Sequence, residues 1–353
     1  MRMLRSTIAV SAALMLGLTA CSTSTPAETG APTTEPTKPA TSAPAPETSA
    51  PEASTPAEGE LPKGDGSQTI YLVSKGFQHR FWQAVKEGAE KAGTEYGYKI
   101  QFVGPDDETK VTQQLDQLKT ALDSKPAAIG FAALDTGAAA DVLSQIEAAN
   151  IPMIAFDSGV DSDLPLTTVQ TDNYAAAEAA AEQMSKLLGG KGTVGLVCHD
   201  QTSQTGKQRC DGFADWMKAN APDIKVLDPQ YAGEVGLAAN TAKAMIQANP
   251  DITGVYGSNE AAATGAVQGA TESGKEGLTV VGFDSGKTQL DAIRSGAMAG
   301  AVTQAPVLMG YETVVAAVKA INGVELPKVI DSGFAWYDAS NIDDPDIAAN
   351  LYE

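Results

Sequence analysis

The chain has 353 residues, 43% of them hydrophobic, and it carries a formal net charge of −20 at pH 7. A charge this negative argues against a nucleic-acid partner, which requires a basic stripe, and against adhesion of the protein surface to anionic lipid. The length is sufficient for two domains of ordinary size.

Residues 1–20 have the pattern of a secretory signal. Arg2 and Arg5 form a basic region, an apolar stretch covers residues 8–18, and Leu-Thr-Ala precedes Cys21. The apolar stretch is too short to span a bilayer as a permanent helix. A cysteine at this place resembles the bacterial lipobox, so Cys21 is expected to be acylated and to become the mature N-terminus. An ordinary signal peptide that contains a cysteine is the alternative.

The next segment, 21–66, has the composition of a tether. It consists mainly of Thr, Ser, Ala, Pro and Glu, and Leu61 is its one large apolar residue. With so little to bury, the segment cannot offset the entropy of ordering it and is expected to be disordered. A flexible chain of this length spans roughly 35–40 Å, and proline extends it further. We therefore expect a folded domain anchored to the outer face of the cell membrane through lipid.

From about Gln68 onwards, short apolar runs alternate with helical patterns. The expected strands are 69–73, 100–103, 127–131, 152–156, 193–197, 225–227, 254–256 and 278–283. The expected helices are 81–96, one with Leu115, Leu118 and Leu122 on one face, 138–149, 175–188, 206–219, 237–247 and 261–272. Gly97 is the expected stop of the first helix.

This alternation predicts an α/β fold in which helices cover both faces of parallel sheets. Two such series in sequence indicate two similar lobes. In open α/β sheets, ligands bind beyond the carboxyl ends of the strands. Two lobes therefore place their strand-end residues around one cleft.

Seven segments at or near these strand ends carry a family resemblance. They are Ser74-Lys-Gly with Phe81-Trp82, Ala155-Phe-Asp157, Thr171-Asp-Asn173, Arg209-Cys-Asp-Gly-Phe213, Ser258-Asn-Glu260, Val281-Gly-Phe-Asp284 and Val302-Thr-Gln-Ala-Pro306. In this order and spacing they resemble the type I periplasmic binding proteins for sugars, the group that contains the ribose, allose and galactose receptors. The resemblance covers essentially all of residues 68–353.

The resemblance implies two doubly wound parallel-sheet lobes joined by a three-stranded hinge. The N-terminal lobe would comprise 67–171 plus 305–331, and the C-terminal lobe 172–304 plus 332–353. Asp172 and Asn173 look like one hinge crossing, with others after Gln304 and near 331–333. Such crossings let the lobes rotate while each stays folded. A ligand held by both lobes would stabilise the closed form, which a transporter can distinguish from the open one.

The loop after the first expected strand holds four candidate ligand contacts. Phe81 and Trp82 begin the first helix, and aromatic planes can cover the apolar C–H faces of a pyranose ring. Packing of both rings between helix and sheet is the alternative. Lys75 and His79 lie in the same loop and offer hydrogen-bond donors, although His79 fits a solvated loop position equally well.

Two carboxylates follow phenylalanines at matching strand ends, Asp157 after Phe156 and Asp284 after Phe283, and Phe283 is assigned to the site with them. An ionised carboxylate can accept hydrogen bonds from two adjacent hydroxyls. Acid–base catalysis by a carboxylate pair is one alternative, and it requires surroundings that separate the two pKa values. Capping of the following helix is the other. The resemblance favours binding.

Three further residues complete the expected site. By resemblance, Arg209 projects into the cleft and donates a bidentate pair to ligand oxygens; a surface salt bridge is the alternative. Asn259 and Gln304 each offer a donor and an acceptor, which matches the dual character of a hydroxyl.

Two cysteines remain besides Cys21. Cys198 and Cys210 could form a disulfide in an oxidising compartment, and free buried thiols are the alternative. Without a His/Cys cluster their spacing does not indicate a metal site.

The first loop and one strand end depart from the ribose receptor. Ser158 stands where that receptor has an arginine, and Lys75 and His79 replace smaller amides. These departures indicate a ligand other than ribose.

Taken with the resemblance, the sequence predicts a monomeric sugar-binding lipoprotein that serves a membrane ABC permease without cofactor or metal. A repressor of the same fold would need an N-terminal helix-turn-helix, where this chain has a signal and tether. An enzyme is disfavoured because the chain has no Gly-x-Ser-x-Gly elbow, His-Glu-x-x-His or phosphate loop. A sensory receptor with the same cleft, or a binder of a nucleoside or autoinducer, remains open.

Overall fold

The computed structural model describes residues 61–77 and 79–352. The expected signal, the expected acylation site Cys21 and tether residues up to 60 lie outside the described residues, so those expectations stay predictions.

The first sheet has six strands in the order β12-β5-β4-β3-β1-β2, and neighbouring strands run parallel. Its strands are β1 Thr69–Val73, β2 Lys99–Val103, β3 Ala128–Phe131, β4 Met153–Phe156, β5 Thr168–Gln170 and β12 Val329–Asp331. Its central strands β3 and β4 are buried along their whole length, as expected for a parallel sheet covered on both faces.

The second sheet has seven strands in the order β13-β11-β10-β9-β6-β7, with β8 paired to β6. Its strands are β6 Gly192–Cys198, β7 Ile224–Val226, β8 Gln230–Tyr231, β9 Gly254–Gly257, β10 Thr279–Phe283, β11 Gly300–Gln304 and β13 Phe334–Tyr337. The last of these pairs antiparallel with β11, and the other pairs are parallel.

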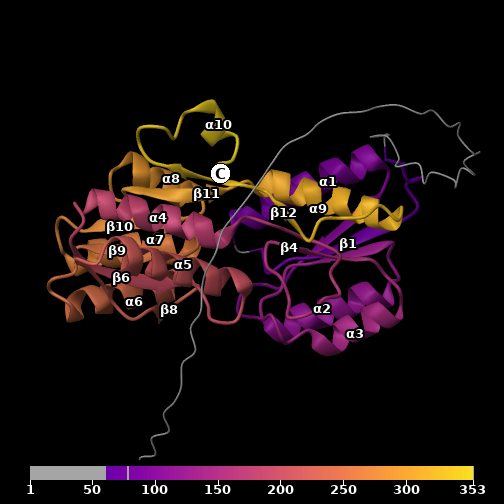
Figure 1. Cartoon of the computed structure of the whole chain (residues 1–353), viewed down its shortest axis with the longest axis horizontal. Coiled ribbons are helices and arrows are strands. Elements are labelled where there is room, and N and C mark those ends of the chain that lie inside the picture. The colour runs from indigo at the N-terminus through magenta and orange to yellow at the C-terminus, as the bar shows by residue number, and fades with distance from the viewer. Residues whose placement is uncertain (1–60, 78, 353) are drawn as a thin grey trace, which may run out of the picture. The chain divides into compact units, whose positions relative to one another are not determined.

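Helices cover both faces of each sheet (Figure 1). On the first sheet, α1 (Arg80–Tyr96) and α9 (Pro306–Ile321) lie over one face, and α2 (Val111–Asp123) and α3 (Ala140–Ala148) over the other. On the second sheet, α4 (Asn173–Leu187) and α5 (Gln204–Asn220) oppose α6 (Val235–Ala248), α7 (Glu260–Ser273) and α8 (Lys287–Arg294). A short α10 (Pro345–Ala348) follows β13. The predicted two-lobed, doubly wound α/β fold is confirmed.

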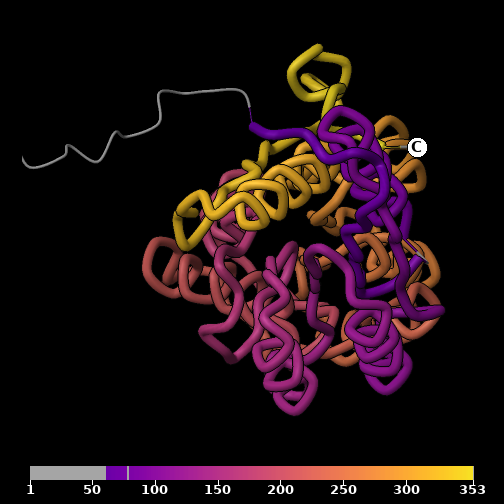
Figure 2. The backbone as a smooth tube through the Cα atoms, turned by 90° about the vertical axis from the view of Figure 1, so that its right-hand side faces the viewer, coloured from indigo at the N-terminus to yellow at the C-terminus, as the bar shows by residue number. Residues whose placement is uncertain are grey.

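Helix α9 comes late in the chain but belongs to the first lobe, so Figures 1 and 2 show its orange-yellow trace beside the indigo and purple early segments. Glycines permit its close contact with α1. A Cβ added at Gly88 would overlap the carbonyl oxygen of Val307, and one at Gly310 would overlap that of Val85. Two helix backbones can approach this closely only where side chains are missing.

The chain passes between the two sheets three times: after β5, after β11, and between β12 and β13. The first crossing leads into α4, whose first turn is capped by Asp172, because its side chain accepts a hydrogen bond from the Ala175 amide at 3.0 Å. Helix α1 ends at Gly97 in a left-handed conformation, φ 73°, as predicted from the sequence.

Candidate ligand-binding site

Strand ends from the two lobes enclose a small cavity. It is lined by Lys75, His79, Phe81, Trp82, Glu108, Asp157, His199, Arg209, Asn259, Asp284 and Gln304. Nine of the ten residues expected to bind ligand line it, all except Phe283. The cavity volume is about 20 Å³, room for about one water molecule. In this conformation, polar side chains of the two lobes therefore meet one another across the cleft.

The N-terminal half of the cavity is built around Lys75 and Asp157, both almost completely buried. The Lys75 ammonium lies 3.4 Å from Asp157 Oδ2 and donates a hydrogen bond to Thr205 Oγ1 of the other lobe at 2.9 Å. Burial opposes its charge, yet the carboxylates of Asp157 and Glu108 outweigh burial and raise the pKa of Lys75. Lys75 is therefore protonated at neutral pH.

Asp157 has unused acceptor capacity. Burial raises the pKa of its carboxyl group, and the Lys75 ammonium opposes that rise. Taken alone, that direction would favour a neutral acid, but the charged ammonium at 3.4 Å supports an ion pair. Among the described residues, no group donates a hydrogen bond to Asp157 Oδ2. A ligand hydroxyl can supply that missing donor.

Trp82 acts as a donor as well as a core side chain. Its indole Nε1 donates to Glu108 Oε1 at 2.7 Å, and His79 Nε2 lies 3.9 Å from the same oxygen. Burial opposes the charge of Glu108, but His79 and Lys75 outweigh it and lower the pKa of this carboxyl. The Trp82 ring packs edge-on against Phe81, with centroids 4.9 Å apart. The loop after β2 thus places a third carboxylate in the cavity.

The C-terminal half is centred on Arg209, which projects from α5. Its Nε donates to Asn173 Oδ1 at 2.7 Å and its Nη1 to the Ser258 carbonyl at 3.2 Å. Nη1 also lies 3.8 Å from Asp284 Oδ2. The guanidinium covers the ring of Phe283, 3.8 Å from its centroid. Phe283 therefore does not line the cavity in this conformation, because its ring lies behind Arg209, and its expected contact with ligand stays a prediction.

Asp284 is held by more partners than Asp157. Gln304 Nε2 donates to its Oδ1 at 2.7 Å, and the amide of Glu260, at the start of α7, donates to its Oδ2 at 2.9 Å. With Arg209 nearby, both carboxylate oxygens are engaged within the protein. In this conformation, contacts within the protein alone hold this half of the site.

The two strand-end aspartates share an unusual backbone conformation. Asp157 has φ 57° and Asp284 has φ 79°, in the left-handed region that aspartate tolerates better than most side chains. Each amide still donates to the neighbouring strand, to the carbonyl of Val169 at 2.9 Å and of Val302 at 2.7 Å respectively. The tight turn after the last ladder bond places each carboxylate at the cleft. Such strained backbone is typical of functional sites.

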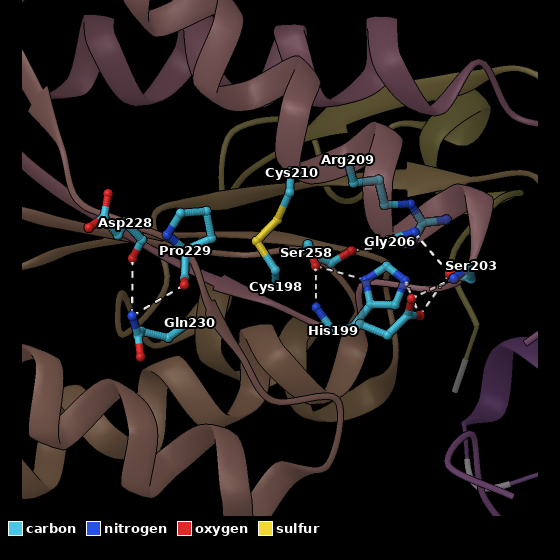
Figure 3. The surroundings of a disulfide bond; sticks show 11 residues. Cys198, His199, Ser203, Gly206, Arg209, Cys210, Asp228, Pro229, Gln230 and Ser258 are labelled. Atoms are coloured by element: carbon cyan, nitrogen blue, oxygen red, sulfur yellow. Dashed lines mark hydrogen bonds and ion pairs between the residues drawn. A yellow bond between two sulfur atoms is a disulfide. The ribbon is translucent and has the colours of Figure 1, made fainter. Parts of the chain in front are cut away.

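A disulfide joins Cys198 at the end of β6 to Cys210 in α5, with Cα atoms 6.1 Å apart (Figure 3). The next residue after Cys198 is His199, and the residue before Cys210 is Arg209; both line the cavity. The disulfide therefore links the two backbone segments that carry these side chains.

His199 was not expected at the site. Its Nδ1 lies 2.7 Å from Ser258 Oγ (Figure 3). Its Nε2 lies 3.3 Å from Thr205 Oγ1. Burial lowers the pKa of His199 to about 3, so the ring is neutral at neutral pH. A neutral imidazole offers one donor and one acceptor, which suits a network of hydroxyl groups.

Asn259 lines the cavity and also caps a helix. Its Oδ1 accepts a hydrogen bond from the Ala262 amide at 2.8 Å, which caps α7. Among the residues that the structure describes, its side-chain NH₂ group donates no hydrogen bond. Capping of the following helix was the alternative considered for Asp157 and Asp284, but α8, the helix after Asp284, has Gly286 at its N-cap.

Direct hydrogen bonds also join the lobes through residues that do not line the cavity. Thr202 Oγ1 donates to the Leu134 carbonyl at 2.9 Å, and the Gly159 amide donates to Gln204 Oε1 at 2.6 Å. Ser158 Oγ accepts a hydrogen bond from the Gln204 amide at 3.2 Å. Its side chain thus contributes an inter-lobe contact.

Sequence reasoning missed Glu108 and His199. His199 follows the last residue of β6, and Glu108 lies in the loop after β2. The rule that ligands bind beyond the carboxyl ends of strands would have found both, had it been applied to every strand end.

Over residues 61–77 and 79–352, no group of three or more His, Cys, Asp or Glu side chains is arranged to hold a metal ion. Within the same ranges, the helices are too short or too polar to cross a membrane.

Comparisons with known proteins agree with this architecture. A family model described as a periplasmic binding protein domain matches residues 70–325. The D-apiose import binding protein of Actinobacillus succinogenes is 26% identical over 229 residues, which cover 64% of this chain and 73% of that protein.

Two solved structures are similar over most of the chain. An ABC transporter solute-binding protein from Agrobacterium vitis, bound with α-D-tagatopyranose, is 31% identical with a TM-score of 0.78, covering 81% of this chain and 100% of that one. A carbohydrate transporter solute-binding protein from Agrobacterium radiobacter, in complex with D-arabinose, is 32% identical with a TM-score of 0.75, covering 80% and 98%. The family match spans more than half of the chain, and the protein belongs to the periplasmic binding protein domain family.

Proposed function

We propose that this protein is the extracytoplasmic solute-binding lipoprotein of an ABC importer. It binds a monosaccharide or a related polyhydroxylated molecule reversibly, and does not convert it. The observation that carries the proposal is the meeting of two strand-end carboxylates, Asp157 and Asp284, with Lys75 and Arg209 in one cavity between the lobes.

These groups suit hydroxyl recognition. A carboxylate can accept from two adjacent hydroxyls, whereas lysine and arginine donate to hydroxyl oxygens. Hydrogen bonds to charged groups contribute about 1.5–3 kcal/mol each. Phe81 and Trp82 line the same cavity and supply apolar surface for the C–H groups of a sugar. The related proteins bound with tagatopyranose and arabinose support this ligand class.

Binding requires movement of the lobes. A cavity of about 20 Å³ is too small for a monosaccharide, so the lobes must separate for entry and close around the ligand at a wider setting. The ligand then replaces direct contacts such as Lys75 to Thr205. Because both lobes contribute, the ligand stabilises the closed arrangement, which a permease can recognise. Departures at Ser158, Lys75 and His79 favour a ligand other than ribose.

Isothermal titration of the purified protein against monosaccharides, polyols and nucleosides tests the proposal. We expect saturable binding of at least one polyhydroxylated compound and its recovery unchanged from the complex. Conversion of the compound would contradict simple binding. A panel without a binder would refute the ligand class.

Membrane attachment is tested separately. We expect fatty-acid label incorporated during growth to be lost in Cys21→Ala. Label retained in that variant would refute acylation at Cys21 and leave the ligand proposal intact.

A further inference from the structure

The three crossings between the lobes meet at one buried hydroxyl, that of Thr171. Its Oγ1 lies 3.0 Å from Gln304 Oε1 at the second crossing. It also lies 3.4 Å from Ser332 Oγ and 3.4 Å from the Gly333 carbonyl oxygen, both at the third crossing. Thr171 itself lies at the first crossing, has no exposed surface, and is not among the described residues that line the cavity.

A threonine hydroxyl has one hydrogen to donate, and the shortest contact assigns it to Gln304 Oε1. On its other side, the Gln304 amide nitrogen donates to Asp284 Oδ1 at 2.7 Å, and an ionised carboxylate can only accept. The Gln304 amide is thus oriented from both ends. The Ser332 hydroxyl can donate to Thr171 in turn, which makes a directional chain of donors that ends on the cavity carboxylate.

The backbone carbonyl of Thr171 supports Arg209, the second charged residue of this half-site, through Asn173. Asn173 Nδ2 donates to the Thr171 carbonyl at 2.9 Å, and Asn173 Oδ1 accepts from Arg209 Nε at 2.7 Å. A single amide side chain therefore separates Thr171 from each charge of the C-terminal half-site, Asp284 through Gln304 and Arg209 through Asn173.

We propose that Thr171 is a positioning residue for ligand binding. Its hydroxyl and carbonyl orient the two amides that hold Asp284 and Arg209, and its contacts with all three crossings tie that orientation to the angle between the lobes. Lobe opening shifts the crossings relative to one another and so loosens the half-site, whereas closure restores it. This inference rests on the proposed function, because it concerns the same cavity.

The test uses three threonine variants of the full chain. Thr171→Val keeps the shape and removes the hydroxyl, whereas Thr171→Ser keeps the hydroxyl. Thr167→Val is the matched control, since Thr167 is also buried and its Oγ1 has no hydrogen-bond partner among the described residues. Dissociation constants for a compound bound by the wild type are measured by titration, and melting temperatures in parallel.

We expect Thr171→Val to weaken binding by roughly tenfold or more, the effect of losing a hydrogen bond that supports a charged group. Thr171→Ser and Thr167→Val should stay within about threefold of the wild type. The effects of Thr171→Val and Gln304→Leu should not add in the double variant, because both act through one amide. A purely structural role would instead lower the melting temperature and leave the dissociation constant unchanged.

Should Thr171→Val fail to fold, Ser332→Ala probes the same chain from its far end and should weaken binding severalfold. Unaltered affinity in Thr171→Val or Ser332→Ala, an equal loss in Thr167→Val, or additive effects with Gln304→Leu would overturn the inference alone. A wild type that binds no compound of the panel would overturn the proposed function, and this inference with it.

Discussion

The two halves of the cleft contain the same arrangement of groups. They differ in how many carboxylate oxygens the protein itself engages. In each, a Phe-Asp pair ends a central strand, the aspartate has positive φ, and a cation from another element lies within 4 Å of its carboxylate. Asp284 is engaged at both oxygens by Gln304, Glu260 and Arg209. Asp157 faces Lys75 and retains an oxygen that accepts no hydrogen bond from the described residues.

The two half-sites therefore differ in what holds their charged groups. In the C-terminal half-site, a disulfide and amides at the crossings supply these contacts from within the protein. The N-terminal half-site keeps acceptor capacity for the ligand. Mutations in the two halves should therefore differ in how they divide their effects between stability and affinity.

Arg209→Ala should have the largest effect. It removes the guanidinium that bonds Asn173 and Ser258 and leaves Asp284 buried with less compensation. The guanidinium is also expected to donate a pair of hydrogen bonds to the ligand, worth about 1.5–3 kcal/mol each, so we expect ligand binding to weaken by at least about a hundredfold in titrations. Lys218→Ala, at an exposed position of the same helix, should bind like the wild type. Affinity retained in Arg209→Ala would remove it from the site.

Loss of the disulfide should come next. A bridge that closes a short loop contributes roughly 2–3 kcal/mol, and the separation here is 12 residues. We expect Cys198→Ala/Cys210→Ala to lower the free energy of unfolding by about that amount in denaturant titrations. Binding should also weaken, because the segments carrying His199 and Arg209 lose their link. Two titratable thiols in the unfolded, unreduced wild type would contradict the bridge.

Replacing each of the two carboxylates separately tests the difference between the half-sites most directly. Asp284→Asn disturbs bonds with Gln304, the Glu260 amide and Arg209, so we expect it to lower the free energy of unfolding by about 1–3 kcal/mol. Asp157→Asn should lower it less while weakening ligand binding at least as much. Denaturant unfolding and titration of both variants decide the matter. Equal losses of stability would show that the two halves are braced alike.

The smallest expected effect concerns pH. Burial raises the pKa of Glu260 to about 7. The charges of Asp284 and Glu108 add to this rise, whereas His79 and Arg80 oppose it. A raised pKa means that the folded state holds the proton more tightly. Glu260 therefore stabilises the fold fully below pH 4.5, its ordinary pKa, and that contribution is lost as pH rises through 7.

The side chain of Glu260→Gln cannot ionise, so the variant should not lose this stability as pH rises. We expect the variant to be about 1 kcal/mol more stable than the wild type at pH 8, with the gain shrinking towards pH 4.5. Thermal unfolding across that range measures it. Glu276→Gln, at an exposed position after the same helix, should show no such gain. A constant difference between Glu260→Gln and wild type at all pH values would refute the assignment.

Much of the fold could be predicted from periodicity. The expected strand 69–73 is β1, and helix 81–96 is α1 with one residue added at its start. The short β5 and the elements after Phe283 were not assigned, among them β11, α9 and β13. β5 has three residues, and β11 has the sequence Gly-Ala-Val-Thr-Gln with one large apolar residue, so neither forms the apolar run that identified the other buried strands.

The sequence by itself determined the two-lobed α/β fold and placed nine of ten expected residues at the cavity, because strand ends and family segments are local features. The tertiary structure alone decided what those residues do there. It turned Phe283 behind Arg209, made Trp82 a donor to Glu108, and brought Thr171 to Gln304 across 133 residues of chain. Such contacts depend on how separate segments pack in space, and local patterns carry no information about that packing.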